Sequence, residues 1–162
     1  MAGSYLATYL NDHLAGSVTA LELLGHLVEA HAGTAVAGFL VRLRADIEAD
    51  QEELKSLIGR FGAGTSVARR AAAWLAEKAA ELKLRADDPA GGALRLLESL
   101  EVVSLGIEGK RSLWLALKAA TGSNPGLRGP DYGRLLLRAE EQRSQVETAR
   151  LDAARGALAA SP

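Results

Sequence analysis

The sequence contains no cysteine, and this absence removes a whole set of chemistries. Without a thiol the chain can form no disulfide, offers no cysteine nucleophile and cannot hold zinc or an iron–sulfur cluster through sulfur. The start, Met-Ala-Gly-Ser-Tyr, lacks the basic residues and the apolar run of a secretory signal peptide. Both features fit a reducing compartment, and we expect a cytoplasmic protein.

Aromatic residues, net charge and long apolar runs are also scarce. Aromatic side chains make up only 4% of the chain, too few for a surface that stacks on single-stranded nucleic acid. The formal net charge of -1 creates no general field that would attract nucleic acid or an anionic membrane. No apolar run approaches the roughly 18 residues of a membrane span. We therefore expect neither nucleic acid nor a membrane among the partners.

The residues that are abundant favour a single helical domain over 1–162. Hydrophobic residues make up 48% and charged residues 24%, and long stretches are rich in Ala, Leu, Glu, Lys and Arg. Apolar residues recur with helical spacing, and no strand-like alternation is present. Thr34 and Asp131 are predicted to cap helices at their N-termini. The predicted helices cover residues 4–31, 34–60, 66–85, 93–120 and 131–159.

Four of these helices are long, and the helix at 66–85 is shorter. It is still long enough, at about 1.5 Å per residue, to travel most of the length of a bundle. The simplest all-α architecture is therefore two antiparallel hairpins joined by a long crossover that contains this extra helix. In that arrangement the helices at 34–60 and 93–120 run parallel.

Two runs look like those of uncharacterised bacterial helical-bundle proteins: Tyr9–Gly16, and Ser104–Lys110. The chain also resembles the ferritin-like superfamily in its predicted order of a hairpin, a long crossover and a second hairpin. This resemblance implies a four-helix bundle. Di-iron members of that superfamily place inward glutamates on two helices and Glu-x-x-His on the other two. This chain contains no Glu-x-x-His. We therefore expect no metal and no other cofactor, and a di-iron oxidoreductase or iron-handling protein is the alternative.

Helical wheels place several polar residues near the core, at similar depths along the bundle. Asp50 lies inside the apolar arc of its helix, and Ser17 lies near the centre of another arc. Because an unpaired buried carboxylate is costly, we expect Asp50 to pair with Arg111 or Arg143. The pattern predicts either a structural network or a ligand site. Its predicted members are His13, Ser17, Asp50, Glu108, Arg111 and Arg143.

Two other features have simpler interpretations. Gly106 and Gly109 lie inside a predicted helix, where each costs about 1 kcal/mol against Ala. We expect close approach of another helix there, with a local kink as the alternative. Glu22, His26 and Glu29 share a helical face that points away from the core. That face is interpreted as a solvated charged surface, and a surface metal site is the alternative.

No stretch carries a recognisable catalytic motif, and three functional hypotheses remain. The first is a non-enzymatic bundle that acts through self-association or a protein partner. The second is the di-iron alternative, and the third is an anion-binding bundle that uses Arg111 and Arg143. A homodimer is expected because the helix at 93–120 carries apolar residues outside its core arc. The helix at 131–159 carries three more, Leu137, Leu151 and Leu158.

Overall fold

The computed structural model describes residues 2–61 and 92–159 and is all-helical over these residues, without a strand. Its α-helices are α1 (Ala2–Ala30), α2 (Ala37–Arg60), α4 (Ala93–Ala120) and α5 (Tyr132–Ala157). A short 3-10 helix, η1 (Pro125–Leu127), precedes α5. The predicted all-α class is thus confirmed. The predicted helix at 66–85 lies outside the described residues. No described helix is both long enough and apolar enough to cross a membrane.

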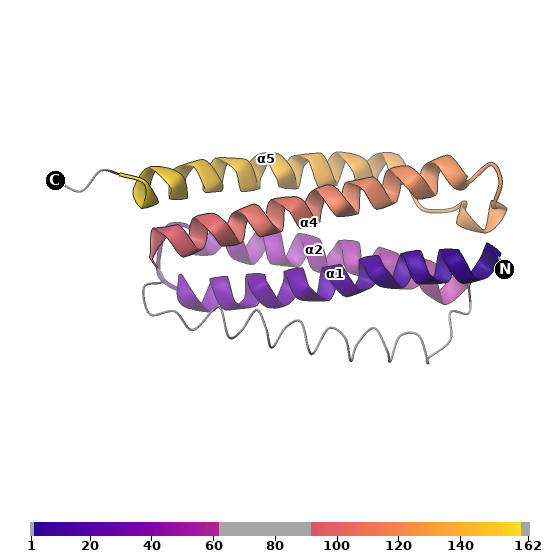
Figure 1. Cartoon of the computed structure of the whole chain (residues 1–162), viewed down its shortest axis with the longest axis horizontal. Coiled ribbons are helices and arrows are strands. Elements are labelled where there is room, and N and C mark those ends of the chain that lie inside the picture. The colour runs from indigo at the N-terminus through magenta and orange to yellow at the C-terminus, as the bar shows by residue number, and fades with distance from the viewer. Residues whose placement is uncertain (1, 62–91, 160–162) are drawn as a thin grey trace.

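The long helices lie side by side along one axis (Figure 1). α1 and α2 form one antiparallel hairpin, and α4 and α5 form another. α1 packs against α2 and also against α4, so the two hairpins share a core. The ends of the ribbons show that α2 and α4 run in the same direction, as the predicted architecture requires (Figure 1). Residues at equal depth on these two helices can therefore meet.

The turn between α1 and α2 differs from the prediction. Thr34 does not cap α2, because its hydroxyl donates a 2.6 Å hydrogen bond back to the carbonyl of His31. α2 begins only at Ala37 and has no side-chain cap. Gly33 adopts a φ of 78°, a left-handed conformation that glycine takes without strain. The three residues after Gly33 therefore belong to the turn and not to the helix.

The loop between α4 and α5 is fixed by local hydrogen bonds. Asp131 caps α5 as predicted, since its carboxylate accepts a 3.0 Å hydrogen bond from the backbone N–H of Arg134. Leu127 is buried, and its carbonyl accepts a 2.7 Å hydrogen bond from the hydroxyl of Tyr132. Burial raises the pKa of Tyr132, although nearby Arg60 opposes this shift. The loop thus seals one end of the core.

The core consists of two apolar clusters, one toward each end of the bundle. One cluster is built around the following buried side chains: Leu24, Leu27, Leu40, Leu43, Ile47, Leu97, Leu100, Val103, Ile107, Ala139, Val146 and Ala153. The other contains Leu10, Leu54, Leu57, Ile58, Leu113, Trp114, Leu117, Leu127, Tyr132 and Leu135. On α2 the change from one cluster to the other occurs between Ile47 and Leu54, and on α4 between Ile107 and Leu113. Polar residues occupy both intervals.

The two predicted caps make a matched test of helix termination. Asp131→Ala removes a side chain that satisfies a backbone N–H of α5, and we expect it to lower the free energy of unfolding by about 1 kcal/mol. Thr34→Ala removes only an exposed hydrogen bond within the turn, so its effect should stay within about 0.5 kcal/mol. Urea denaturation followed by circular dichroism measures both. Equal losses in the two variants would contradict the assignment.

Candidate functional site

A buried carboxylate lies at the level where the two core clusters meet. Asp50 of α2 has a side chain that is only 2% exposed. One of its oxygens lies 2.5 Å from Nζ of Lys110 on α4 and accepts a 3.0 Å hydrogen bond from the amide of Gln142 on α5. Its other oxygen forms an ion pair with Arg138 of α5, and Lys110 also donates to the amide oxygen of Gln142. These four residues, here called the polar layer, link three helices.

The polar layer places two cationic side chains against one buried carboxylate. The side chains of Lys110 and Arg138 are 15% and 24% exposed, so neither is freely solvated. Burial is the main influence on Lys110 and lowers its pKa, and the attraction of Asp50 opposes that shift without cancelling it. Arg138 also lowers the pKa of Lys110 and Asp46 raises it, so charges beyond the four residues of the layer act on this ammonium.

A second set of polar groups comes from α1. Ser17 accepts a 2.9 Å hydrogen bond from the amide of Gln51 on α2, and its own hydroxyl donates to the carbonyl of Leu14. His13 lies one turn earlier, with its ring edge-on to Tyr9 at 4.7 Å between centroids. Burial lowers the pKa of His13, although the neighbouring carboxylate of Asp12 opposes this shift. The neutral imidazole is thus favoured.

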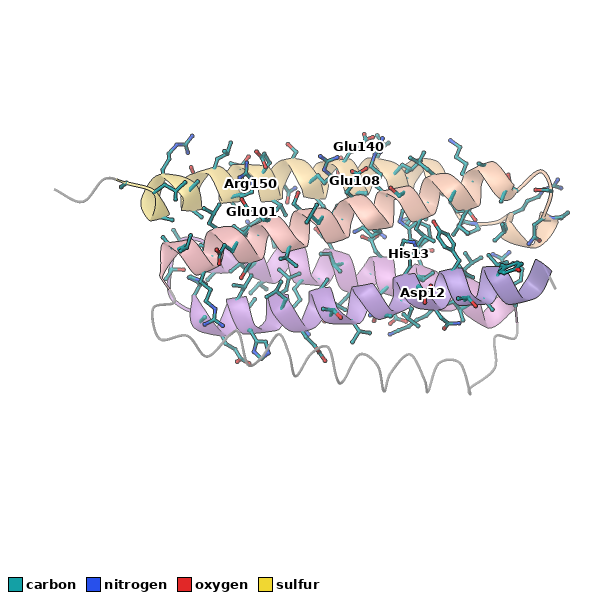
Figure 2. The ribbon with its side chains drawn as sticks, in the orientation of Figure 1. Asp12, His13, Glu101, Glu108, Glu140 and Arg150 are labelled. Carbon is teal, nitrogen blue, oxygen red and sulfur yellow. The ribbon has the colours of Figure 1, made fainter. Side chains whose placement is uncertain are left out.

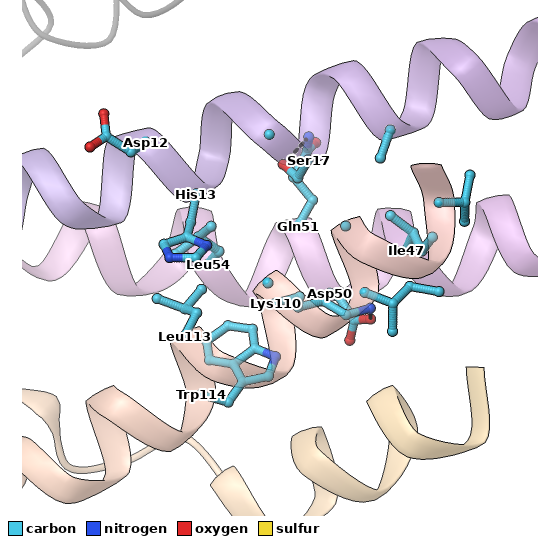
Figure 3. Close-up of a pocket in the computed structure, with 16 residues that line it drawn as sticks. Asp12, His13, Ser17, Ile47, Asp50, Gln51, Leu54, Lys110, Leu113 and Trp114 are labelled. Carbon is cyan, nitrogen blue, oxygen red and sulfur yellow. Dashed lines mark hydrogen bonds and ion pairs between the residues drawn. The ribbon is translucent and has the colours of Figure 1, made fainter. Parts of the chain in front are cut away.

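A cavity of about 190 Å³ separates these two groups of polar residues, between α1, α2 and α4. His13 and Ser17 approach it from α1, Asp50 and Gln51 from α2, and Lys110 and Trp114 from α4 (Figure 3). The rest of its wall is largely apolar and includes Ile47, Leu54, Val103, Ile107 and Leu113. The indole N–H of Trp114 is buried without a hydrogen-bond acceptor among the described residues.

Glycines inside the helices keep this volume open. Gly16 of α1, with Gly106 and Gly109 of α4, lines the cavity. A Cβ added at any of these three positions would meet no described heavy atom within 4 Å. Among the described residues, no helix approaches Gly106 or Gly109 closely, and the predicted crossover helix at 66–85 lies outside them.

Three members of the predicted core layer lie at the surface. Glu108 of α4 forms a 2.6 Å ion pair with Arg143 of α5, and Arg111 contacts Glu108 and Glu140 at 3.5 and 3.4 Å. Figure 2 shows Glu108 and Glu140 along the seam of α4 and α5, away from His13. Their side chains are 30–55% exposed, which makes them a surface ion-pair cluster. The prediction that Asp50 pairs with Arg111 or Arg143 is therefore wrong.

The true partners, Lys110 and Arg138, carried a signal in the sequence. Lys110 begins a series with Leu113, Trp114 and Leu117 at the i, i+3, i+4, i+7 spacing of a core-facing stripe. Arg138 and Gln142 continue such a stripe from Leu135 on α5. The predicted position of the polar residues along the axis of α4 was right, since Lys110 lies between Glu108 and Arg111 in the sequence. The predicted helical face was wrong: the apolar arc predicted for the helix at 93–120 leaves out Leu113, which is buried.

The described residues contain no group of three or more carboxylate or histidine side chains that could hold a metal ion. Glu22, His26 and Glu29 are all exposed on α1. In the polar layer, the oxygens of Asp50 contact cations, which compete directly with a metal for the same lone pairs. The chemistry of this donor set therefore does not fit a di-iron centre.

The polar layer predicts a strong and specific loss of stability. We expect Asp50→Ala to lower the free energy of unfolding by about 3–5 kcal/mol, because it leaves two partly buried cations without their carboxylate. Lys110→Met should cost less, since Asp50 keeps Arg138 and Gln142. Glu52→Ala is the matched control, because Glu52 is an exposed carboxylate two residues along α2. Chemical denaturation of all three variants is the measurement, and a value for Asp50→Ala equal to that of Glu52→Ala would refute the assignment.

Comparisons of the chain with protein-family models, with curated proteins and with solved structures find no match. The function must therefore be inferred from the charges, the open volume and the glycines of the site itself.

Proposed function

We propose that this protein is a non-catalytic binding protein that takes up a small molecule in the cavity between α1, α2 and α4. The observation that carries the proposal is the set of three helix-interior glycines around open space. Alanine would fit at each position and would favour the helix by about 1 kcal/mol. The chain therefore keeps the volume open at a cost to its own stability, as ligand sites commonly do.

The dimensions and the lining indicate the size of the ligand. An engineered apolar protein cavity of about 150 Å³ binds benzene. The cavity here, at about 190 Å³, has room for one ring with a small substituent, or for a short branched chain. Its mixed wall, apolar with a few converging polar groups, is the usual composition of a small-molecule site.

The polar groups around the cavity support binding and not nucleophilic catalysis. Ser17 directs its hydroxyl at the carbonyl of Leu14 and accepts from Gln51, so it is not paired with His13. A serine nucleophile needs a base within hydrogen-bond reach to take its proton. No such pair is formed by the described residues that line the cavity.

The helix arrangement supports a place beside the ferritin-like bundles. The parallel directions of α2 and α4 support it, because two hairpins joined by a long crossover have this arrangement (Figure 1). In this proposal the level that holds iron in the di-iron proteins instead holds Asp50 with its two cations. We therefore favour a branch that binds organic ligands over an iron-handling protein, and the reducing cytoplasm as its compartment.

Tryptophan fluorescence tests the cavity directly. In a Trp74→Phe background, Trp114 is the sole tryptophan and lines the site; Trp74 lies outside the described residues. We expect toluene, benzyl alcohol or benzoate to change its emission saturably, because each fits the volume. Gly109→Leu should abolish the change by filling the cavity.

The matched control is Gly59→Leu, at a helical glycine that also has open space around its Cβ and does not line the cavity. It should leave the titration unchanged, with circular dichroism confirming that both variants fold. If none of the three compounds gives a saturable change, or if Gly109→Leu binds as well as the parent, the proposed function is wrong.

Self-association is a second candidate, which the exposed leucines favour. Leu94, Val102 and Leu105 share one face of α4 and are 51%, 49% and 74% exposed. Leu137 and Leu151 of α5, and Leu158 directly after its last residue, are also exposed. An apolar stripe of this kind is typical of a surface that is covered in an assembly, and a second copy of the chain is the simplest occupant.

A charge placed on this stripe tests the assembly. We expect multi-angle light scattering of the parent at high micromolar concentration to give the mass of a dimer. Leu105→Glu should shift it to the monomer, because a carboxylate cannot be buried there without a partner. Glu52→Gln, a change to an exposed residue of α2, should leave the dimer intact. A parent that is already monomeric would exclude this candidate.

A further inference from the structure

The charged groups deep in the cavity wall are already paired with one another. Lys110 donates to Asp50 and to Gln142. Asp50 also forms an ion pair with Arg138, which does not line the cavity. Asp12, the other charged residue among the described ones in the wall, is exposed at the edge of the cavity. An ion that entered would lose its water and gain no unpaired opposite charge, so the site favours an uncharged ligand.

His13 is the polar side chain of the wall that remains open to a ligand. Ser17 and Gln51 hydrogen-bond to each other. The ring of His13 contacts Tyr9 edge-on, and neither of its nitrogens forms a hydrogen bond with a described residue. The ring is only partly buried, and Figure 3 shows it reaching from α1 toward α4, where Trp114 lies. A ligand in the cavity therefore meets an imidazole without a hydrogen-bond partner.

The protonation state of His13 defines what this imidazole can bind. Burial lowers its pKa, and the attraction of Asp12 offsets that shift only in part. The ring is therefore uncharged at neutral pH, with one nitrogen that donates and one that accepts. A hydroxyl group both donates and accepts, so it can satisfy either nitrogen.

We infer that the ligand of this site is a small uncharged molecule with an apolar body and one hydroxyl group, and that His13 is the residue that binds the hydroxyl. This inference rests on the proposed function and names the class of ligand that the cavity takes. The apolar body packs against Leu54 of α2 and against Ile107 and Leu113 of α4, all of which line the cavity. A hydrocarbon of the same size fills the volume but leaves the imidazole unpaired.

Ligands of nearly equal size and different charge test this inference. Benzyl alcohol, benzoate, benzylamine and toluene are titrated against the full chain by isothermal titration calorimetry at neutral pH and constant ionic strength. We expect benzyl alcohol to bind about tenfold more tightly than either ion, because an ion must leave water without gaining an opposite charge. If benzoate or benzylamine binds as tightly as benzyl alcohol, or if toluene alone binds, the inference is wrong and the proposed cavity stands. If none of the four binds, the proposed function fails as well.

Substitution of His13 identifies the residue that binds the hydroxyl. His13→Leu should weaken benzyl alcohol about tenfold, because its hydroxyl loses a partner inside an apolar site, and should leave toluene within about twofold. His26→Leu is the matched control, since His26 is an exposed histidine of α1 that does not line the cavity, and it should leave both affinities unchanged. If both ligands still bind His13→Leu and are affected equally, the inference is wrong.

A conservative variant separates a lost hydrogen bond from a collapsed cavity. Should His13→Leu bind neither ligand, His13→Gln decides, because glutamine keeps an uncharged donor and acceptor at this position. If His13→Gln retains the parent's ratio of benzyl alcohol affinity to toluene affinity, the hydrogen bond is supported. A ratio about tenfold below that of the parent refutes it.

Discussion

The structure depends on one buried carboxylate. Asp50 lies where the two apolar clusters meet, and its contacts run to α4 through Lys110 and to α5 through Arg138 and Gln142. A carboxylate out of water is tolerated only when it is paired and hydrogen-bonded. A shift of any of these helices along its axis would separate the Asp50 carboxylate from the groups that pair with it. The polar layer therefore fixes the positions of three helices along the bundle axis. Apolar contacts alone would allow several such positions with similar free energies.

The middle of the bundle is filled on one side and open on the other. Toward α5, the long side chains of Arg138 and Gln142 occupy the space beside Asp50. Toward α1, at the same level, Gly16, Gly106 and Gly109 line the cavity, and Gly16 and Gly106 are exposed. Lys110 contributes to both sides. The element that stabilises the fold and the element proposed to bind a ligand thus meet at a single ammonium group.

This arrangement has a price in stability. Each of the three glycines inside helices costs about 1 kcal/mol against alanine. Together they remove a large part of the free energy of unfolding, which is about 5–15 kcal/mol for a typical domain. The fold does not require this cost, because a methyl group would fit at each position without touching a described atom. The proposed ligand site would account for it.

The sequence by itself determined the all-helical class, the position of α4 and the burial of Asp50. Helical periodicity and helix-stopping residues are local, and they act in the same way in any context. The depth of the polar layer also followed, since it depends only on residue counts along helices that run parallel. The cap at Asp131 was predictable for the same reason, because it is made within four residues of α5.

Only the tertiary structure decided which cations meet Asp50 and where the core is left empty. On a helical wheel Lys110 and Arg111 lie at similar angles from the apolar arc, on opposite sides of it. The rotation of α4, set by the packing of Leu113 and Leu117, directs the first inward and leaves the second with Glu108 and Glu140 at the surface. Gly106 and Gly109 are equally ambiguous, because a missing side chain permits either close contact or a void. The neighbouring helix decides between them, and that neighbour is not encoded in the periodicity of one segment.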